Sequence, residues 1–170
     1  MDTVTNTSPR WLTPRERHAW LSYLVMNQLL DGALDRQLQR DADIPHAYYM
    51  LLAMLSEAPG RALRMSELAE ITNSSQSRVS HAVTRLEDAG WVMREKCPTD
   101  RRGNIARLTD AGYAAVVAAA PGHVAAVREN LFDALTAEQV EQLIAICEAA
   151  LARLDPDGRA RAAHALTPDR

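Results

Sequence analysis

A tight turn between two short helical segments constrains the fold of this chain more than any other feature. The first segment, "SELAEIT", begins at Ser66, a residue type that caps helices. Asn73 follows it and tolerates the left-handed backbone conformation that ends a helix. Ser74 or Ser75 then caps the second segment, which stops at Gly90. Two helices of this length joined by so short a turn predict a helix-turn-helix.

The second helix of this motif has one apolar face and one polar face without acids. One side holds Val79, Ala82, Val83 and Leu86 at helical spacing and is predicted to pack inward. The opposite face offers short polar side chains and arginines, which is what a helix that enters the major groove of DNA needs. An ordinary solvated face is the alternative interpretation of the same pattern. The residues that we expect to contact DNA from this helix are Ser75, Gln76, Ser77, Arg78, Ser80, His81, Thr84 and Arg85.

The segment after the second helix has an extended pattern and carries two adjacent arginines at its tip. "WVMREKC" and "NIARL" flank the tip, and Ala106 and Leu108 can share one inward face. Arg101 and Arg102 repel each other, so we infer that their counter-charge belongs to another molecule. An arginine at such a tip can lie in the narrow minor groove, where the potential is most negative. Asp100 can hold the guanidinium of Arg102, and the whole segment predicts a winged helix.

The basic side chains are concentrated in the middle of the chain, although the chain as a whole is acidic. The formal net charge is −3 at pH 7, but residues 76–107 hold seven basic and four acidic side chains, a local excess of +3. Binding to a polyanion depends on where the basic groups cluster. The distribution therefore permits DNA binding by the winged helix. The negative total argues against a non-specific architectural DNA-binding protein.

Long helices are predicted on both sides of the winged helix. Thr13, Pro14 and Glu16 form a strong helix start for one helix that runs to about residue 40. A second helix is expected at roughly residues 46–57. The fold class is therefore mainly α with a small β-wing.

Two further helices are predicted after the hairpin. Thr109 caps the first, which we expect to be interrupted and kinked at Pro121-Gly122. Thr136 and Gln139 form a capping box at the start of the last helix. That helix carries an apolar stripe of Val140, Leu143, Ile144, Cys147 and Leu151.

The sequence points away from membrane and secreted classes. No apolar run approaches the roughly 18 residues that a membrane span needs, and residues 1–12 do not resemble a signal peptide. Cys97 and Cys147 have no CxxC spacing, which predicts a cytoplasmic chain with reduced thiols.

Catalytic and metal-binding classes are also disfavoured. Ser80, His81 and Asp88 contain the residue types of a catalytic triad, but on one helix they cannot converge. The five histidines are scattered, without the spacing of a zinc site. We expect no enzyme activity, no cofactor and no metal.

The helix-turn-helix and the hairpin together resemble the MarR family of bacterial transcriptional regulators. "MSELAEITNSSQSRVSHAVTRLEDAGWV" and "DRRGNIARLT" carry the resemblance, which spans roughly residues 11–154. The wing pattern of that family is an Asp, any residue, an Arg, and a spacer that ends in Leu-Thr. Asp100, Arg102, Leu108 and Thr109 match it. "WLTPRERHAWLSYL" and "CPTDRRG" look most like the actinobacterial branch.

The resemblance implies a homodimer built from the first and last helices, with the apolar stripe of the last helix at the interface. Each protomer would present one winged helix to half of a palindromic operator, the half-sites lying about 34–36 Å apart. Repression is the usual mode, and the partner would be double-stranded DNA of the nucleoid. The implied division is a tail (1–12), a helical dimerisation region (13–44 and 110–154), a winged helix (45–109) and a flexible tail (155–170).

Many relatives bind small phenolic anions between the dimer helices and the DNA-binding lobes. Trp20, Tyr23, Asn27, Tyr48 and Tyr49 are the candidate lining of such a pocket here, the alternative being that the rings belong to the core. The alternative that the chain binds an operator without any ligand, as a constitutive regulator or as an activator, also stays open.

Two other functions that this resemblance suggests, peroxide sensing and a methyltransferase module, fit the sequence less well. Organic-peroxide sensors carry a reactive Cys early in the first helix, where this chain has none. Cys97 at the wing base can be exposed, while Cys147 in the apolar stripe is expected to be buried. The winged helix of some methyltransferases needs a glycine-rich catalytic domain downstream, and residues 110–170 have a helical pattern instead.

Overall fold

The computed structural model describes residues 9–97 and 100–158, with only the backbone described for residues 100–102. Helices dominate, with one small sheet, so the predicted fold class is confirmed. In chain order the elements are α1 (Pro14–Ala42), α2 (His46–Glu57), η1 (Pro59–Arg61), β1 (Ala62–Arg64), α3 (Met65–Ile71), α4 (Gln76–Asp88), β2 (Val92–Cys97), β3 (Asp100–Leu108), α5 (Asp110–Asn130), η2 (Phe132–Ala134) and α6 (Ala137–Leu154).

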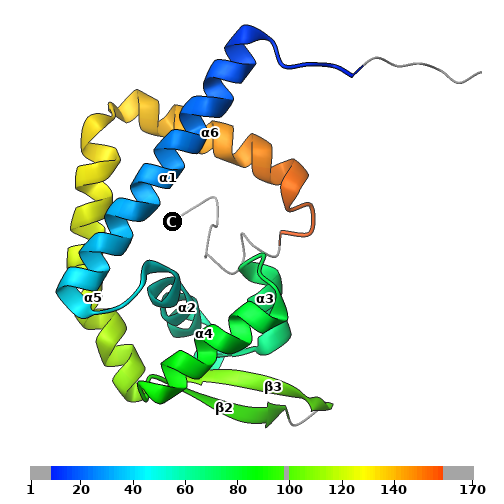
Figure 1. Ribbon diagram of the computed structural model, residues 1–170, viewed down its shortest axis with the longest axis vertical. Helices are drawn as coiled ribbons and strands as arrows, with labels where there is room; N and C mark the ends of the chain where they lie inside the picture. The colour runs from blue at the N-terminus through cyan, green and yellow to red at the C-terminus, as the bar shows by residue number, and fades with distance from the viewer. Residues whose placement is uncertain (1–8, 98–99, 159–170) are drawn as a thin grey trace, which may run out of the picture.

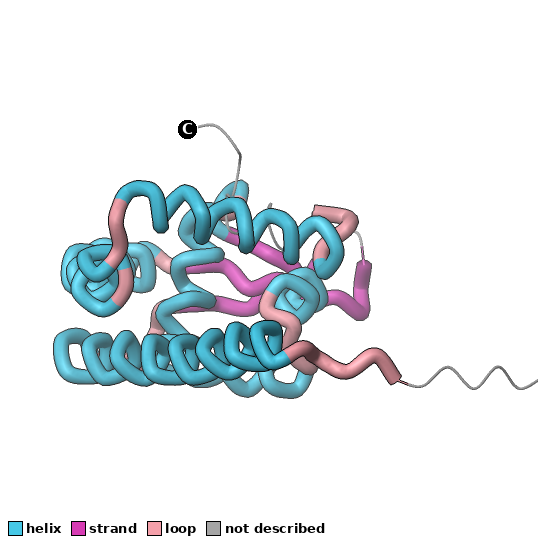
Figure 2. Tube along the Cα trace, turned by 90° about the horizontal axis from the view of Figure 1, so that it is seen from above, coloured by secondary structure: helices cyan, strands magenta, loops and turns pink. Residues whose placement is uncertain are grey.

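The winged helix occupies one end of the molecule. α3, α4 and the hairpin of β2 and β3 lie together there, while the first half of α1 and α6 lie at the opposite end (Figure 1). α5 leads from the hairpin to that far end. Seen from above, α1 and α6 run along opposite edges of the molecule (Figure 2). The helices that the family resemblance assigns to a dimer therefore extend away from the winged helix.

The core lies between the helices of this lobe and the inner face of an antiparallel sheet with the strand order β1-β3-β2. Ala106 and Leu108 are 0% and 4% exposed, which confirms their shared inward face. β1 was not predicted from the sequence. It has three residues, too few for an alternating pattern, and it forms by pairing with β3. The largest side chains that are fully buried are Leu38, Ile44, Leu52, Leu55, Leu68, Leu86 and Val83.

Most helix starts follow the predicted capping residues. Thr13 and Glu16 form a capping box, in which the Glu16 N–H donates to Thr13 Oγ1 (3.2 Å) and the Thr13 N–H donates to Glu16 Oε2 (2.7 Å). The hydroxyls of Ser75, Thr109 and Thr136 cap α4, α5 and α6, and Thr136 also forms a capping box with Gln139. Each hydroxyl satisfies a backbone N–H that has no partner within its helix.

The predicted start of α3 at Ser66 is wrong. The helix begins at Met65, and the N-cap position is taken by Arg64, whose backbone N–H donates to Glu67 Oε2 (2.8 Å). Arg64 is also the last residue of β1, where it pairs with Ile105. Strand pairing therefore fixes the helix start, ahead of the serine that the local sequence favours.

The predicted interruption at Pro121-Gly122 is also wrong, because α5 is continuous through Pro121. Val116, Ala119 and Ala126 are buried on either side of the proline, so packing holds both halves in one helix. The ribbon changes direction between its greener first half and its yellow second half (Figure 1), as expected for a helix with an internal proline.

Polar and aromatic contacts join α2 to α1 and α5. The His46 N–H donates to Asp35 Oδ1, and His46 Nδ1 lies 2.8 Å from Asp31 Oδ1. The ring of His123 on α5 lies 4.7 Å from the ring of Tyr49 on α2. Burial and the nearby His46 lower the pKa of His123, so its ring is neutral at pH 7. These contacts fix the orientation of the winged helix relative to the long helices.

Candidate nucleic-acid interface

α4 exposes the polar face predicted for it and buries the opposite one. Val79, Val83 and Leu86 are buried and Ala82 is partly buried against them, which confirms the inward face. Ser80 is half-buried. The exposed residues of the predicted DNA-contacting set are Ser75, Gln76, Ser77, Arg78, His81, Thr84 and Arg85.

The basic side chains on this face have no partner among the described residues. In the part of the chain that the structure describes, the side chains of Arg78, His81 and Arg85 make no hydrogen bond or ion pair. No acid lies in the first turn of α4. The face therefore presents donors that are available to an anion.

Two of the predicted contact residues already use their hydroxyl groups within the chain. Ser75 Oγ accepts a hydrogen bond from the Arg78 N–H (3.3 Å) as the cap of α4. Thr84 Oγ1 donates to the Ser80 carbonyl (2.9 Å) and accepts from Arg94 Nη2 (2.7 Å). Because a threonine has one hydroxyl proton, Thr84 has no donor left for a base edge.

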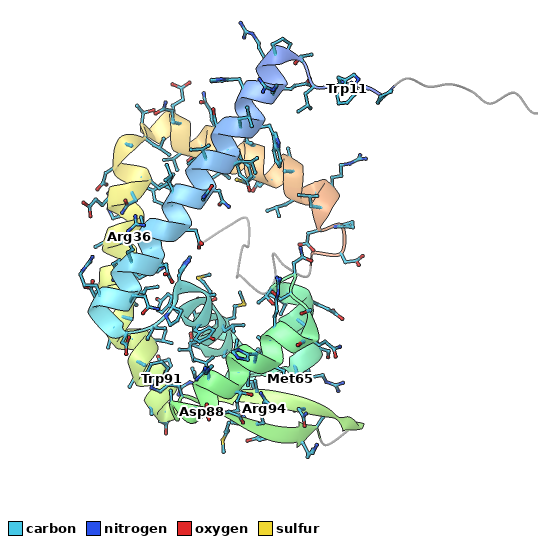
Figure 3. All side chains as sticks on the ribbon, viewed as in Figure 1. Trp11, Arg36, Met65, Asp88, Trp91 and Arg94 are labelled. Atoms are coloured by element: carbon cyan, nitrogen blue, oxygen red, sulfur yellow. The ribbon has the colours of Figure 1, made fainter. Side chains whose placement is uncertain are left out.

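Arg94 on β2 is a residue of this surface that sequence reasoning missed. Its Nη2 also donates to the Ser80 carbonyl (2.7 Å), and its Nε lies 3.0 Å from Glu87 Oε2. Figure 3 shows Arg94 where β2 passes α4. Its register partner Ala106 is fully buried, so Arg94 occupies an inward position of the sheet. The sequence did contain a signal for this. Residues two apart in a strand face the same side of the sheet, so Arg94 shares the inward side of Val92.

A polar hollow lies between α3, α4 and the hairpin. Its volume is about 330 Å³, and none of the described residues that line it is acidic. Arginines, hydroxyls and amides at such a spacing suit the oxygen atoms of a phosphate. The lining residues are Arg64, Met65, Ser66, Gln76, Ser80, Arg94, Gly103 and Asn104.

The outer face of the hairpin is held by Arg107. Its Nε and Nη2 donate to the two carboxylate oxygens of Glu95 (2.7 and 3.0 Å), and its Nη1 donates to the Gly60 carbonyl (2.8 Å). The Arg107 guanidinium lowers the pKa of Glu95. The base of the wing is therefore fixed by Arg107 on one face and by Arg94 on the other.

The tip of the wing is at the edge of the described residues. Residues 98–99 lie outside them, as do the side chains of Asp100, Arg101 and Arg102. The backbone of β3 begins at Asp100, which pairs with Cys97. The contact between Asp100 and Arg102 and the minor-groove role of both arginines stay predictions.

Similar proteins identify the family to which this chain belongs. The MarR family model matches residues 42–103. Sco3205 of Streptomyces coelicolor, a MarR family transcriptional regulator solved in complex with DNA, is 53% identical, with a TM-score of 0.82 over 89% of this chain and 94% of Sco3205. This chain belongs to the MarR family.

Other relatives agree with this assignment. AbsC, another MarR family transcriptional regulator of S. coelicolor, is 40% identical, with a TM-score of 0.77 over 89% of this chain and 99% of AbsC. YfiV of Bacillus subtilis, an uncharacterised HTH-type transcriptional regulator, is 30% identical over 100 residues, which are 58% of this chain and 60% of YfiV. The chain is thus a MarR-family transcriptional regulator.

The five candidate effector residues do not come together in the single chain. Trp20, Tyr23 and Asn27 are exposed on the first half of α1, where the two rings stack with centroids 6.1 Å apart. Tyr49 is buried against His123, as the core alternative predicts. Tyr48 is half-buried and lines a groove between α2 and α4.

That groove combines an apolar body with a basic rim. Its volume is about 470 Å³, and Met50, Leu51 and Met54 of α2 contribute apolar side chains to its lining. Arg78, from the predicted DNA-contacting set, also lines it. Such a groove suits a small amphipathic anion.

The proposed dimer helices carry apolar side chains that their own chain leaves uncovered. α6 has no buried residue: Val140, Leu143 and Leu151 are half-buried, and Ile144 and Cys147 are exposed. Trp11, ahead of α1 in Figure 3, is 82% exposed. A helix that is apolar on several sides is normally enclosed by protein. The exposed large apolar residues of α1 are Trp20, Leu21, Tyr23, Leu24, Val25, Met26 and Leu29.

Both expectations about the cysteines are wrong for the single chain. Cys97 is buried, because the register shift between Lys96 and Cys97 turns its side chain inward. Cys147 is exposed, because no other described element covers that side of α6.

Among the described residues, no group of three or more His, Cys, Asp or Glu side chains is placed to hold a metal ion. In the same residues, no helix has the length and apolar character of a membrane span.

Proposed function

We propose that this MarR-family regulator is a homodimer that binds an inverted-repeat operator in bacterial DNA and represses transcription from it. Each protomer places α4 in the major groove and the tip of its wing in the adjacent minor groove. A dimer that occupies an operator excludes the polymerase without any further contact, and for that reason we propose repression. The regulator acts in the cytoplasm, associated with the nucleoid.

The observation that carries this proposal is the acid-free, solvent-facing side of α4. Arg78, His81 and Arg85 are exposed there without partners among the described residues. The polar hollow that Arg64, Gln76 and Asn104 help to line adjoins the same helix. The DNA-bound structure of Sco3205, which is 53% identical, supports the same role for this chain. Phosphate contacts supply most of the affinity in such interfaces, so binding should weaken steeply with salt.

Selection of bound DNA from random duplexes tests the proposal. We expect an enriched inverted repeat whose half-sites lie about one helical turn apart. Enrichment of no sequence at moderate ionic strength would contradict sequence-specific binding. Enrichment of a single unrepeated site would contradict the dimer.

Replacement of Arg102 by alanine should weaken binding to the selected duplex by about 1–3 kcal/mol, because one minor-groove contact is lost from each wing. Fluorescence anisotropy measures the affinity, and light scattering should still show a dimer. Arg128→Ala is the matched control, since Arg128 is an exposed arginine near the far end of α5. Unfolding of the Arg102 variant, or an unchanged affinity, would remove Arg102 from the interface.

We further propose that a small phenolic anion acts as an effector and lowers operator affinity. The groove between α2 and α4 supports this, because Tyr48 and Arg78 can receive the ring and the negative charge of one ligand. An anion that engages Arg78 competes with DNA for the same guanidinium. Trp20, Tyr23 and Asn27 join such a site only if a partner chain brings α1 near it.

A panel of hydroxybenzoates tests the effector proposal. We expect at least one of them, at millimolar concentration, to raise the operator dissociation constant, while neutral benzyl alcohol does not. The same compound should lose its effect on an Arg78→Gln variant. The effector proposal fails if no hydroxybenzoate changes the affinity.

A further inference from the structure

Arg94 joins the wing to three positions on one face of α4. Its guanidinium donates to the Ser80 carbonyl and to Thr84 Oγ1, both at 2.7 Å, and lies 3.0 Å from Glu87 Oε2. The Arg94 backbone N–H adds a hydrogen bond to Glu87 Oε1 at 3.0 Å. Positions 80, 84 and 87 lie one above the other on a helix. One side chain therefore spans about two turns of the DNA-contacting helix.

Most of these contacts are partly buried, and the one to Thr84 is exposed. The side chains of Arg94 and Glu87 are 28% and 29% exposed. The charge of Arg94 at an inward position is balanced by Glu87, and the Thr84 hydroxyl bridges Arg94 to the Ser80 carbonyl. A planar guanidinium that serves acceptors in several directions resists rotation more than a single contact does.

The contacts of Arg94 with Ser80, Thr84 and Glu87, here called the anchor, determine where the tip of the wing lies. A small rotation of the hairpin about the anchor produces a large displacement at that tip. Arg102 lies four residues along β3 from Ala106, the register partner of Arg94, which corresponds to about 13 Å of extended chain. A rotation of about 10° at the anchor therefore moves the backbone of Arg102 by about 2 Å. Displacements of that size exceed the tolerance of a hydrogen-bonded contact.

We propose that Arg94 is a positioning residue that fixes the angle between the wing and α4, so that both enter adjacent grooves together. It acts through Arg102 and not through a contact of its own with DNA. Thr84 belongs to this anchor and not to the DNA-contacting set, because its hydroxyl has no donor left for a base edge or a phosphate. This inference rests on the proposed DNA interface.

A double-mutant cycle on the selected duplex tests this inference. Arg94→Ala should weaken binding about tenfold, close to the effect of Arg102→Ala. In the Arg102→Ala background, Arg94→Ala should add less than about threefold, because no wing contact is left to misplace. Arg94→Lys should recover little, since an ammonium cannot serve the same set of acceptors.

Thr84→Val removes one oxygen from the anchor and keeps the shape of the side chain. It should weaken binding about threefold in the natural chain and leave affinity unchanged in the Arg94→Ala background. This variant keeps the inference testable if Arg94→Ala fails to fold. NMR order parameters give a readout without DNA: the amides of residues 103–105 should become more mobile in Arg94→Ala and not in Arg128→Ala.

Two results would overturn the inference. One is that Arg94→Ala weakens binding equally with and without Arg102. The other is lost affinity with unchanged mobility of the wing amides, which would assign Arg94 a direct contact with DNA. Failure of the interface itself is a different outcome, because Arg102→Ala and Arg78→Glu would then leave the affinity of otherwise folded dimers unchanged.

Discussion

Arg78→Glu should abolish operator binding while the protein stays folded and dimeric. Arg78 is exposed on the first turn of α4, and within the described chain its side chain has no partner to lose. The substitution removes a cation and sets a carboxylate against phosphate, an arrangement that costs several kcal/mol per site. A dimer contains two such sites, so the dissociation constant should rise by more than about 10³-fold.

Anisotropy titration with the selected duplex measures the loss, and thermal unfolding should show stability changed by no more than about 0.5 kcal/mol. Arg128→Glu is the control, because it makes the same charge change at an exposed site beside η2. If Arg78→Glu and Arg128→Glu bind equally well, the DNA-contacting face lies elsewhere. Arg78→Gln should fall between the natural chain and Arg78→Glu.

Leu143→Asp should convert the dimer to a monomer. Leu143 is half-buried on α6, in the stripe with Ile144 and Leu151 that the chain itself leaves uncovered. In a dimer the aspartate would lose about 1.5–3 kcal/mol of apolar burial per chain. It would also bury an unpaired charge, which costs more. Two copies meet in one interface, so the dimer dissociation constant should rise by more than about 10³-fold.

Sedimentation equilibrium measures the mass at micromolar concentration. Ala145→Asp is the matched control, because residue 145 is exposed on the polar side of α6 and receives the same charge. We expect a dimer for Ala145→Asp and a monomer for Leu143→Asp, with operator affinity lost together with the dimer. Retention of the dimer mass by Leu143→Asp would place the interface away from this stripe.

The local features of the fold could be predicted because neighbouring residues determine them. Thr13 and Glu16 cap α1 through contacts three residues apart, and the same holds for Thr136 and Gln139 at α6. Asn73 has φ = 46°, as expected for a residue that ends a helix in the left-handed region. The inward face of α4 follows from the spacing of apolar residues alone.

The features that sequence reasoning missed depend on distant pairing. β1 and the start of α3 are set by hydrogen bonds to β3, more than forty residues later in the chain. The burial of Cys97 follows from a register shift in the hairpin. In the sequence, Arg94 is one more basic residue of the wing. Its contacts with α4 follow only from the packing of the hairpin against that helix. α5 keeps its helix through Pro121 because of the buried alanines on either side.

The candidate effector residues show the same limit. Tyr48 and Tyr49 are adjacent in sequence, yet one lines a groove beside α4 and the other is buried against α5. Helical spacing places them on different faces of α2. Trp20 and Tyr23, for which the sequence offered a pocket or the core, are exposed on α1.

Spacing of the two half-sites tests the central claim most directly, namely that a two-fold dimer holds two winged helices at a fixed separation. Anisotropy titrations compare the selected inverted repeat with the same duplex carrying five extra base pairs at its centre, which turns one half-site to the opposite side of the helix. We expect the affinity to fall to that of a duplex with one half-site. An unchanged affinity would contradict the claim, because it would mean that the two winged helices bind independently.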